Sequence, residues 1–138
     1  MGAIDFFQLV TLLCAAMLGV MIFFGGVVAP TVFKALPAEA AGTFLRRIFP
    51  RYYDLLTVTA VIAALLAVGS WSGLVLALVV ILFVAARFWL MPKINAARDA
   101  SLTGDAEAKR RFGALHGASV AINLSQMVAL AAIIVLAE

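Results

Sequence analysis

The chain has 138 residues, of which 66% are hydrophobic and only 12% are charged. Charged residues alone make up about a quarter of an ordinary soluble domain, so this composition excludes that class and predicts a protein of the lipid bilayer. The single cysteine excludes an intramolecular disulfide and any CxxC metal or redox motif. The formal net charge of +3 is unremarkable, whereas the placement of the charges along the chain is informative.

Three long stretches contain no Asp, Glu, Lys or Arg, namely 6–33, 55–86 and 112–137. Each exceeds the roughly 20 residues that one transmembrane helix needs. The middle stretch is interrupted by Gly69-Ser70-Trp71-Ser72-Gly73, which indicates a tight helical hairpin. We therefore predict an all-α, four-transmembrane-helix bundle in a single domain over residues 1–138, with helices at about 6–29, 52–70, 73–91 and 112–136.

The basic residues predict an orientation. All ten Lys and Arg lie in two segments, one after the first predicted helix and one that begins at Arg87, near the end of the third. By the positive-inside rule these segments face the cytoplasm, so both termini and the Trp71 hairpin lie outside it. We expect a multi-pass protein of the cell membrane, in a bacterium the inner membrane. Membrane lipids are then partners, with anionic lipids at the cytoplasmic face. Met1 to Asp5 lack a basic n-region, so we expect the first helix to be retained.

The segment between the first two spans is amphipathic. Within 38–49, apolar residues recur at helical spacing, with Arg46 and Arg47 on the other side. Pro50 is expected to interrupt this helix before the second span begins. We predict a short interfacial amphipathic helix between helices 1 and 2, which can be simply a connector on the membrane surface.

Asp54 and Arg87 form a candidate intramembrane ion pair. They lie 17 residues before and 16 residues after Trp71, and at about 1.5 Å per residue the hairpin puts them at nearly the same depth. Charges inside a membrane are costly and usually pair or face a polar interior. The pair can act as a structural staple at the inner interface, or it can take part in handling a substrate or ion.

The last predicted helix carries a polar stripe. His116, Ser119, Asn123 and Gln126 fall within an arc of roughly 80°. Such a stripe is expected to face the bundle interior or a partner subunit and to form hydrogen bonds across helices. It can be an interhelical packing network or a path for a solute or proton. Gly113 and Gly117 form a GxxxG motif on the adjacent face, which permits close helix contact.

Cys14, Met17 and Met21 share one face of the first helix. Thiolate and thioether groups suit soft cations such as Cu(I), but methionines at helical spacing usually fill gaps in a core, so we predict no metal site and no cofactor. One His and one Cys cannot provide bis-His haem ligation or a metal cluster. Because we find no Gly-rich phosphate loop, no Ser-His-acid arrangement and no basic region free of the membrane surface, we expect neither an enzyme nor a nucleic-acid-binding protein.

Three segments carry a resemblance to a known family. They are Val32 to Pro37 with Gly42 and Ile48 to Tyr53, then Ala86 to Pro92 with Ala96 and Ala97, and Leu115 to Ser119 with Asn123 and Leu124. Their order and spacing resemble the transmembrane protein 205-like family, a four-span family without an assigned activity, across essentially the whole chain. The resemblance implies the same topology, singles out Arg87, His116, Ser119 and Asn123, and supplies no reaction. The third connection is shorter than in the larger animal members.

Two functions compete. The polar stripe and the Asp54–Arg87 pair favour a subunit of a small-solute or ion transporter or channel, which predicts an oligomer or a narrow pocket because four short helices enclose little space. The Gly- and Ala-rich helix faces favour a non-catalytic membrane scaffold or accessory subunit that acts through helix–helix association, including a homo-oligomer.

Overall fold

A computed structural model describes residues 5–136. Helices dominate it, in the order α1 (Phe6–Phe23), η1 (Phe24–Val28), α2 (Ala29–Ala35), α3 (Ala38–Leu66), α4 (Trp71–Ala85), η2 (Ala86–Leu90), α5 (Met91–Leu102) and α6 (Ala106–Val135). The elements η1 and η2 are π-helical and join their neighbours without a break, so these residues form four continuous helices. The predicted all-α fold with four helices long and apolar enough to cross a membrane is therefore confirmed.

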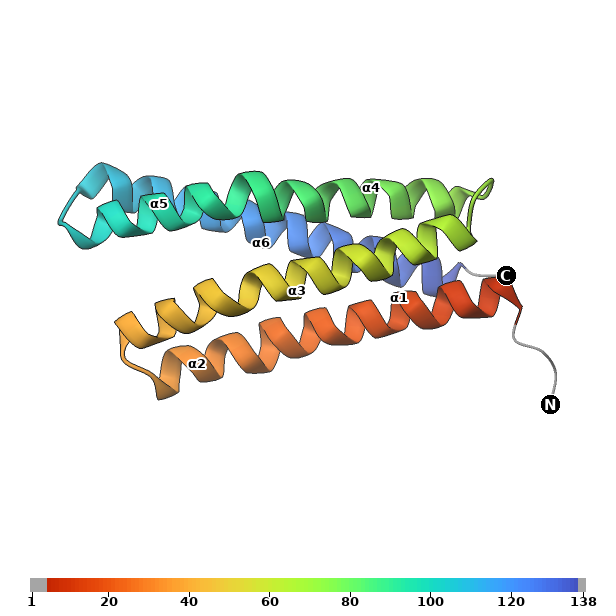
Figure 1. Ribbon diagram of the computed structural model, residues 1–138, viewed down its shortest axis with the longest axis horizontal. Coiled ribbons are helices and arrows are strands. Elements are labelled where there is room, and N and C mark those ends of the chain that lie inside the picture. Colours follow the sequence, from red (N-terminus) through yellow and green to blue (C-terminus); the bar gives the residue numbers. More distant parts are fainter. Residues whose placement is uncertain (1–4, 137–138) are drawn as a thin grey trace.

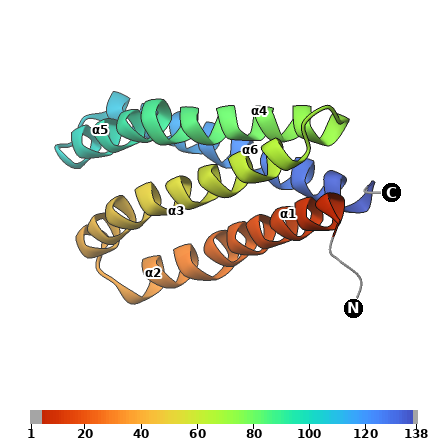
Figure 2. The same cartoon turned by 45° about the vertical axis from the view of Figure 1, so that its right-hand side comes forward.

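The four helices run antiparallel along one axis (Figure 1). The short α3–α4 turn lies at the same end as the first turn of α1 and the last turn of α6. The α2–α3 and α5–α6 connections lie together at the opposite end, which we call the connector end, and a view turned by 45° shows the same arrangement (Figure 2). The helices contain 29 to 32 residues, or roughly 45 Å of helix each, enough to cross a bilayer with its headgroup layers.

The helix starts follow local capping rules. Asp5 and Gln8 form a capping box, in which the Gln8 backbone N–H donates to Asp5 Oδ1 at 2.7 Å. Ser70 caps α4 by accepting from the Gly73 backbone N–H at 3.1 Å. Asp105 caps α6 by accepting from Glu107 and Ala108. Each cap satisfies amide groups that the first turn of a helix leaves unpaired.

Each of the two π-helical segments precedes a proline. Pro30 follows η1 and Pro92 follows η2, each at the second residue after the segment ends. In a regular helix the proline ring clashes with the carbonyl four residues earlier, which here belongs to Gly26 or Phe88, inside the π-helical segment. The wider turn moves this carbonyl away. The helix formed by α1, η1 and α2 and the helix formed by α4, η2 and α5 therefore continue past their prolines to the connector end.

The expected break at Pro50 is wrong. The amphipathic segment is helical, but it is the first part of the 29-residue α3 rather than a separate surface helix. Pro50 removes one backbone hydrogen bond, while Ala41, Leu45, Tyr52 and Leu56 are buried along the same helix. Packing on both sides of the proline keeps the helix continuous, as neighbouring helices commonly do in membrane proteins.

The core is a narrow apolar layer between the four helices. Buried side chains include Met17 of α1, Leu56 of α3, Phe83 of α4 and Leu130 of α6. The outward faces are also apolar: Leu65, Leu74 and Ile81 are 68%, 77% and 62% exposed. Helices that are hydrophobic all round are expected where lipid, rather than water, covers the outer surface.

Candidate functional site

The polar residues of α6 divide into two groups. Asn123 Nδ2 donates to the Tyr52 hydroxyl of α3 at 3.4 Å, and Gln126 Nε2 donates to the Val79 carbonyl of α4 at 3.3 Å. Ser119 lies close to the Tyr53 hydroxyl. His116, by contrast, is exposed and stacks on Phe112 of its own helix, with ring centroids 5.8 Å apart. The structure thus brings three of the four residues against neighbouring helices and leaves His116 outside that network.

Aromatic rings lie beside the contacts that Asn123 and Ser119 make with the two tyrosines of α3. Tyr52 packs against Phe24 of η1 with ring centroids 4.6 Å apart, and Phe24 also contacts Phe49 at 5.1 Å. Tyr53 extends the cluster to Phe83 of α4 at 6.4 Å. The polar contacts of α6 therefore lie beside a packed aromatic cluster. Sequence reasoning quoted Tyr52 and Tyr53 only as part of a family motif and missed their role as partners of α6.

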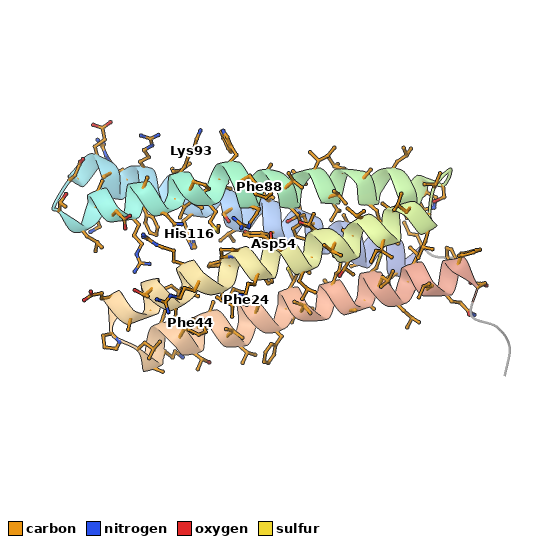
Figure 3. All side chains as sticks on the ribbon, in the orientation of Figure 1. Phe24, Phe44, Asp54, Phe88, Lys93 and His116 are labelled. Carbon is orange, nitrogen blue, oxygen red and sulfur yellow. The ribbon has the colours of Figure 1, made fainter. Side chains whose placement is uncertain are left out.

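The side chains of Asp54 and Arg87 do meet. Arg87 Nε donates to Asp54 Oδ1 at 3.0 Å, as a hydrogen-bonded ion pair between α3 and η2. The guanidinium also lies 5.0 Å from the Phe88 ring centroid. The Arg87 side chain is 23% exposed and that of Asp54 is 55% exposed, so the pair lies on the side of the bundle and links two neighbouring helices there. Figure 3 shows Asp54 and Phe88 along the middle of the molecule.

The sulfur-bearing residues of α1 belong to the core. Cys14, Met17 and Met21 are at most 1% exposed and lie on one buried face with Val10 and Phe24. Within residues 5–136, no group of three or more His, Cys, Asp or Glu side chains is placed to hold a metal ion. Cys14, Met17 and Met21 therefore pack as core residues, and methionines spaced along one helix face usually fill gaps in a core in this way.

A second ion pair joins α3 and α5 at the connector end. Arg46 donates twice to Asp99, from Nη1 to Oδ2 at 3.1 Å and from Nη2 to Oδ1 at 2.6 Å. This hydrogen-bonded pair holds the pKa of the Asp99 carboxyl below its ordinary value. Both side chains are about half exposed. The sequence placed these charges on the same side of the membrane, but it contained no signal for their pairing.

Arg98 makes a further contact across this end. Its Nη2 donates to the Ala38 carbonyl at 3.0 Å, and a Cβ atom at Gly42 would overlap its guanidinium. Gly42 therefore leaves the space in which Arg98 lies against α3. Together, Arg46, Asp99, Arg98 and Gly42 form what we call the clasp, which attaches the start of α3 to α5.

These features define an all-α protein of the multi-pass membrane type, with four helices long and apolar enough to cross a membrane. The chain belongs to the family described as Domain of unknown function (DUF4149), whose profile matches residues 12–102. It is also 31% identical over 122 residues to an uncharacterised protein of Aquifex aeolicus (strain VF5), covering 86% of each chain. No solved structure matches it. The resemblance to the transmembrane protein 205-like family is not confirmed by these comparisons.

Proposed function

We propose that this protein is a non-catalytic scaffold or accessory subunit of the cell membrane that acts through helix–helix association. The observation that carries the proposal is the outward face of α6. His116, Gly113 and Gly117 are all exposed there, and no heavy atom lies within 4 Å of the position that a Cβ would take at either glycine. A GxxxG motif lets a second helix approach closely, and an imidazole gains more from a protein partner than from lipid.

The interior of the bundle supports the same function. Asn123 and Gln126 already bond to Tyr52 and to the Val79 carbonyl. Among the described residues, every buried side-chain nitrogen and oxygen atom of a non-exposed residue has a hydrogen-bond partner. Such contacts tie helices together, so the polar groups left to interact with another chain are on the surface. The proposed partner is either a second copy of this chain or another membrane protein.

The proposed orientation follows the charges. All ten basic residues lie in the half of the molecule that contains the connector end, with Arg51 and Arg87 near the midpoints of their helices, so by the positive-inside rule that end faces the cytoplasm and both termini lie outside it. Anionic lipids of the cytoplasmic leaflet are then expected around this end.

Disulfide crosslinking in native membranes tests the association. In a Cys14→Ala background, Gly117→Cys places a thiol on the proposed face, and Phe88→Cys places one at a position that is 67% exposed elsewhere on the bundle. We expect oxidation to give a covalent dimer or a defined larger adduct from Gly117→Cys and monomer from Phe88→Cys. Monomer from both variants, or equal crosslinking of both, contradicts the proposal.

Transport remains a second candidate because of one specific observation. Tyr52, Tyr53, Ser119 and Asn123 place polar groups from two helices inside the bundle, one residue along α3 from the Asp54–Arg87 pair. A path through this layer predicts that Asn123→Ala changes solute or proton flux in proteoliposomes, whereas His116→Ala, outside the layer, does not. Flux indistinguishable from that of empty liposomes, or equal in both variants, excludes this path.

A further inference from the structure

The connector end carries a groove between α3 and α5. The hollow has a volume of about 240 Å³, and its lining includes Gly42, Arg46, Arg47, Arg98, Asp99 and Leu102. We call it the basic groove. Glu39 also lines it, so three guanidinium groups face two carboxylates. The groove has a net charge of +1 and is complementary to a ligand with a single negative charge.

Two of the three arginines of the basic groove are held in place before any ligand binds. Arg46 is fixed by its two hydrogen bonds to Asp99, and Arg98 by the Ala38 carbonyl and the bare backbone of Gly42. The two ion pairs found among residues 5–136 involve Arg46 and Arg87, so the Arg47 guanidinium has no ion-pair partner among these residues. Guanidinium groups are suited to phosphate oxygens because their N–H donors form a planar fork.

An apolar hollow adjoins the basic groove. It is lined by Leu36, Pro37, Ala40 and Phe44, and it shares Glu39, Thr43 and Arg47 with the groove. Leu36 and Phe44 are 39% and 40% exposed, and the nearby Phe33 is 61% exposed. A phosphate site with exposed apolar side chains beside it fits a phospholipid better than a free anion, because the glycerol and upper acyl carbons have a surface to contact.

From this charge and shape we infer that the basic groove binds the headgroup of one anionic phospholipid, with the phosphate between Arg47 and Arg98 and the start of the acyl chains against Phe44. The site lies near a bilayer surface only if the four helices cross a membrane, so it rests on the membrane placement in the proposed function. It does not depend on which face of the membrane the connector end occupies, or on association through α6.

Native mass spectrometry of the full chain in detergent tests the site. The protein is titrated with phosphatidylglycerol, with phosphatidylcholine and with inorganic phosphate, and bound adducts are counted. We expect the first phosphatidylglycerol to bind more tightly than further phosphatidylglycerols, phosphatidylcholine or phosphate. Arg47→Gln and Arg98→Gln should each lower the affinity for this first lipid by about fivefold, the factor that corresponds to one basic side chain near an anionic surface. Arg110→Gln removes the same charge from the exposed side of α6 and should leave the first adduct unchanged.

Gly42→Ala gives a sharper test because it alters no charge. The added methyl group occupies the space of the Arg98 guanidinium, so the first phosphatidylglycerol should again be weakened, while Gly19→Ala, which has open space around it, should have no effect. Circular dichroism confirms that each variant is folded. Equal affinity for phosphatidylglycerol and phosphatidylcholine, an equal loss in Arg110→Gln, or no loss in Gly42→Ala overturns the assignment. Displacement of the lipid by an equal concentration of inorganic phosphate overturns its lipid part.

These outcomes are separable from those of the crosslinking experiment. A monomer with a selective phosphatidylglycerol site refutes association through α6 and retains the basic groove. A crosslinked dimer without lipid selectivity does the reverse.

Discussion

The two ends of the bundle are held together in different ways. At the α3–α4 turn the contacts are made by backbone and short side chains: Gly69 has a φ of +86°, Ser70 Oγ donates to the Ala67 carbonyl at 2.6 Å, and Ser72 is buried against Ser70. At the connector end, long charged side chains form the clasp. The first end is therefore fixed by steric fit, whereas the second depends on charge and should respond to salt and pH.

The α3–α4 turn should show the largest effect of a single methyl group. A Cβ at Gly73 would meet the Ala67 carbonyl oxygen and carbon, and because these are backbone atoms the turn itself must move. We expect Gly73→Ala to lower the free energy of unfolding by about 1–3 kcal/mol, the usual cost of overpacking. Unfolding by SDS in mixed micelles, followed by circular dichroism, measures it.

Gly19→Ala is the matched control for this substitution. Gly19 lies inside α1 with no heavy atom within 4 Å of the added carbon. Alanine is favoured over glycine in a helix by about 0.5–1 kcal/mol, so this variant should be as stable as the wild type or more so. Equal destabilisation of both variants would show that the turn is not sterically fixed.

The middle of the bundle provides a reference between the two ends. Gln126 is 1% exposed and donates to Val79. Gln126→Leu nearly keeps the volume and removes the hydrogen bond, so we expect a loss of roughly 0.6 kcal/mol and at most about 1.7 kcal/mol, the range for such bonds between membrane helices. Ser125→Ala removes a hydroxyl that bonds only within α6 and should change stability less. A larger effect of Ser125→Ala in the same SDS titration would contradict the assigned contact.

Sequence reasoning was most successful where geometry along one helix or one hairpin was sufficient. Hydropathy gave the four helices, and counting from Trp71 brought Asp54 and Arg87 together because the rise per residue is fixed. It failed at Pro50, because the rule that proline ends a helix considers only the neighbouring residues in sequence. The burial of Tyr52 and Leu56 against other helices, which keeps α3 continuous, depends on residues far away in the sequence. The helices that contain Pro30 and Pro92 also continue past these prolines, because a π-helical turn ahead of each one moves away the carbonyl that the proline ring would meet. These turns were not predicted from the sequence.

His116 shows the same limit inside the candidate site. Periodicity placed it on one stripe with Gln126, but it lies roughly 80° around the helix from that residue. Gln126, Leu130 and Ile133 mark the buried direction of α6, so His116 falls beyond the edge of the interface. The stripe could be predicted from sequence, whereas the position of its buried centre depends on how α6 packs. The clasp was missed because its pairs connect residues 53 and 60 positions apart.

The clasp should give a smaller effect than either steric fit or buried hydrogen bonding. A double-mutant cycle with Arg46→Gln and Asp99→Asn isolates the pair. We expect a positive coupling in low salt that disappears in about 1 M NaCl, because exposed ion pairs are screened. The thermal midpoints of the four proteins in detergent measure it. Coupling that persists in high salt would mean that the clasp, like the α3–α4 turn, is fixed by steric fit rather than by charge.

Acid titration should give the smallest change, with a definite sign. The pKa of Asp99 is lower in the folded protein than its ordinary value because Arg46 donates to it, so the contribution of this carboxylate to stability is fully present above the unfolded pKa and is lost as the pH falls through the folded one. The difference in thermal midpoint between wild type and Asp99→Asn should therefore be constant from about pH 7 to 5 and should shrink below about pH 4. In the Arg46→Gln background, Asp99→Asn should show no such loss. If the thermal midpoint of the wild type instead rose relative to that of Asp99→Asn as the pH fell, the charged Asp99 would be destabilising. That result would contradict a stabilising role for the hydrogen bonds between Arg46 and Asp99.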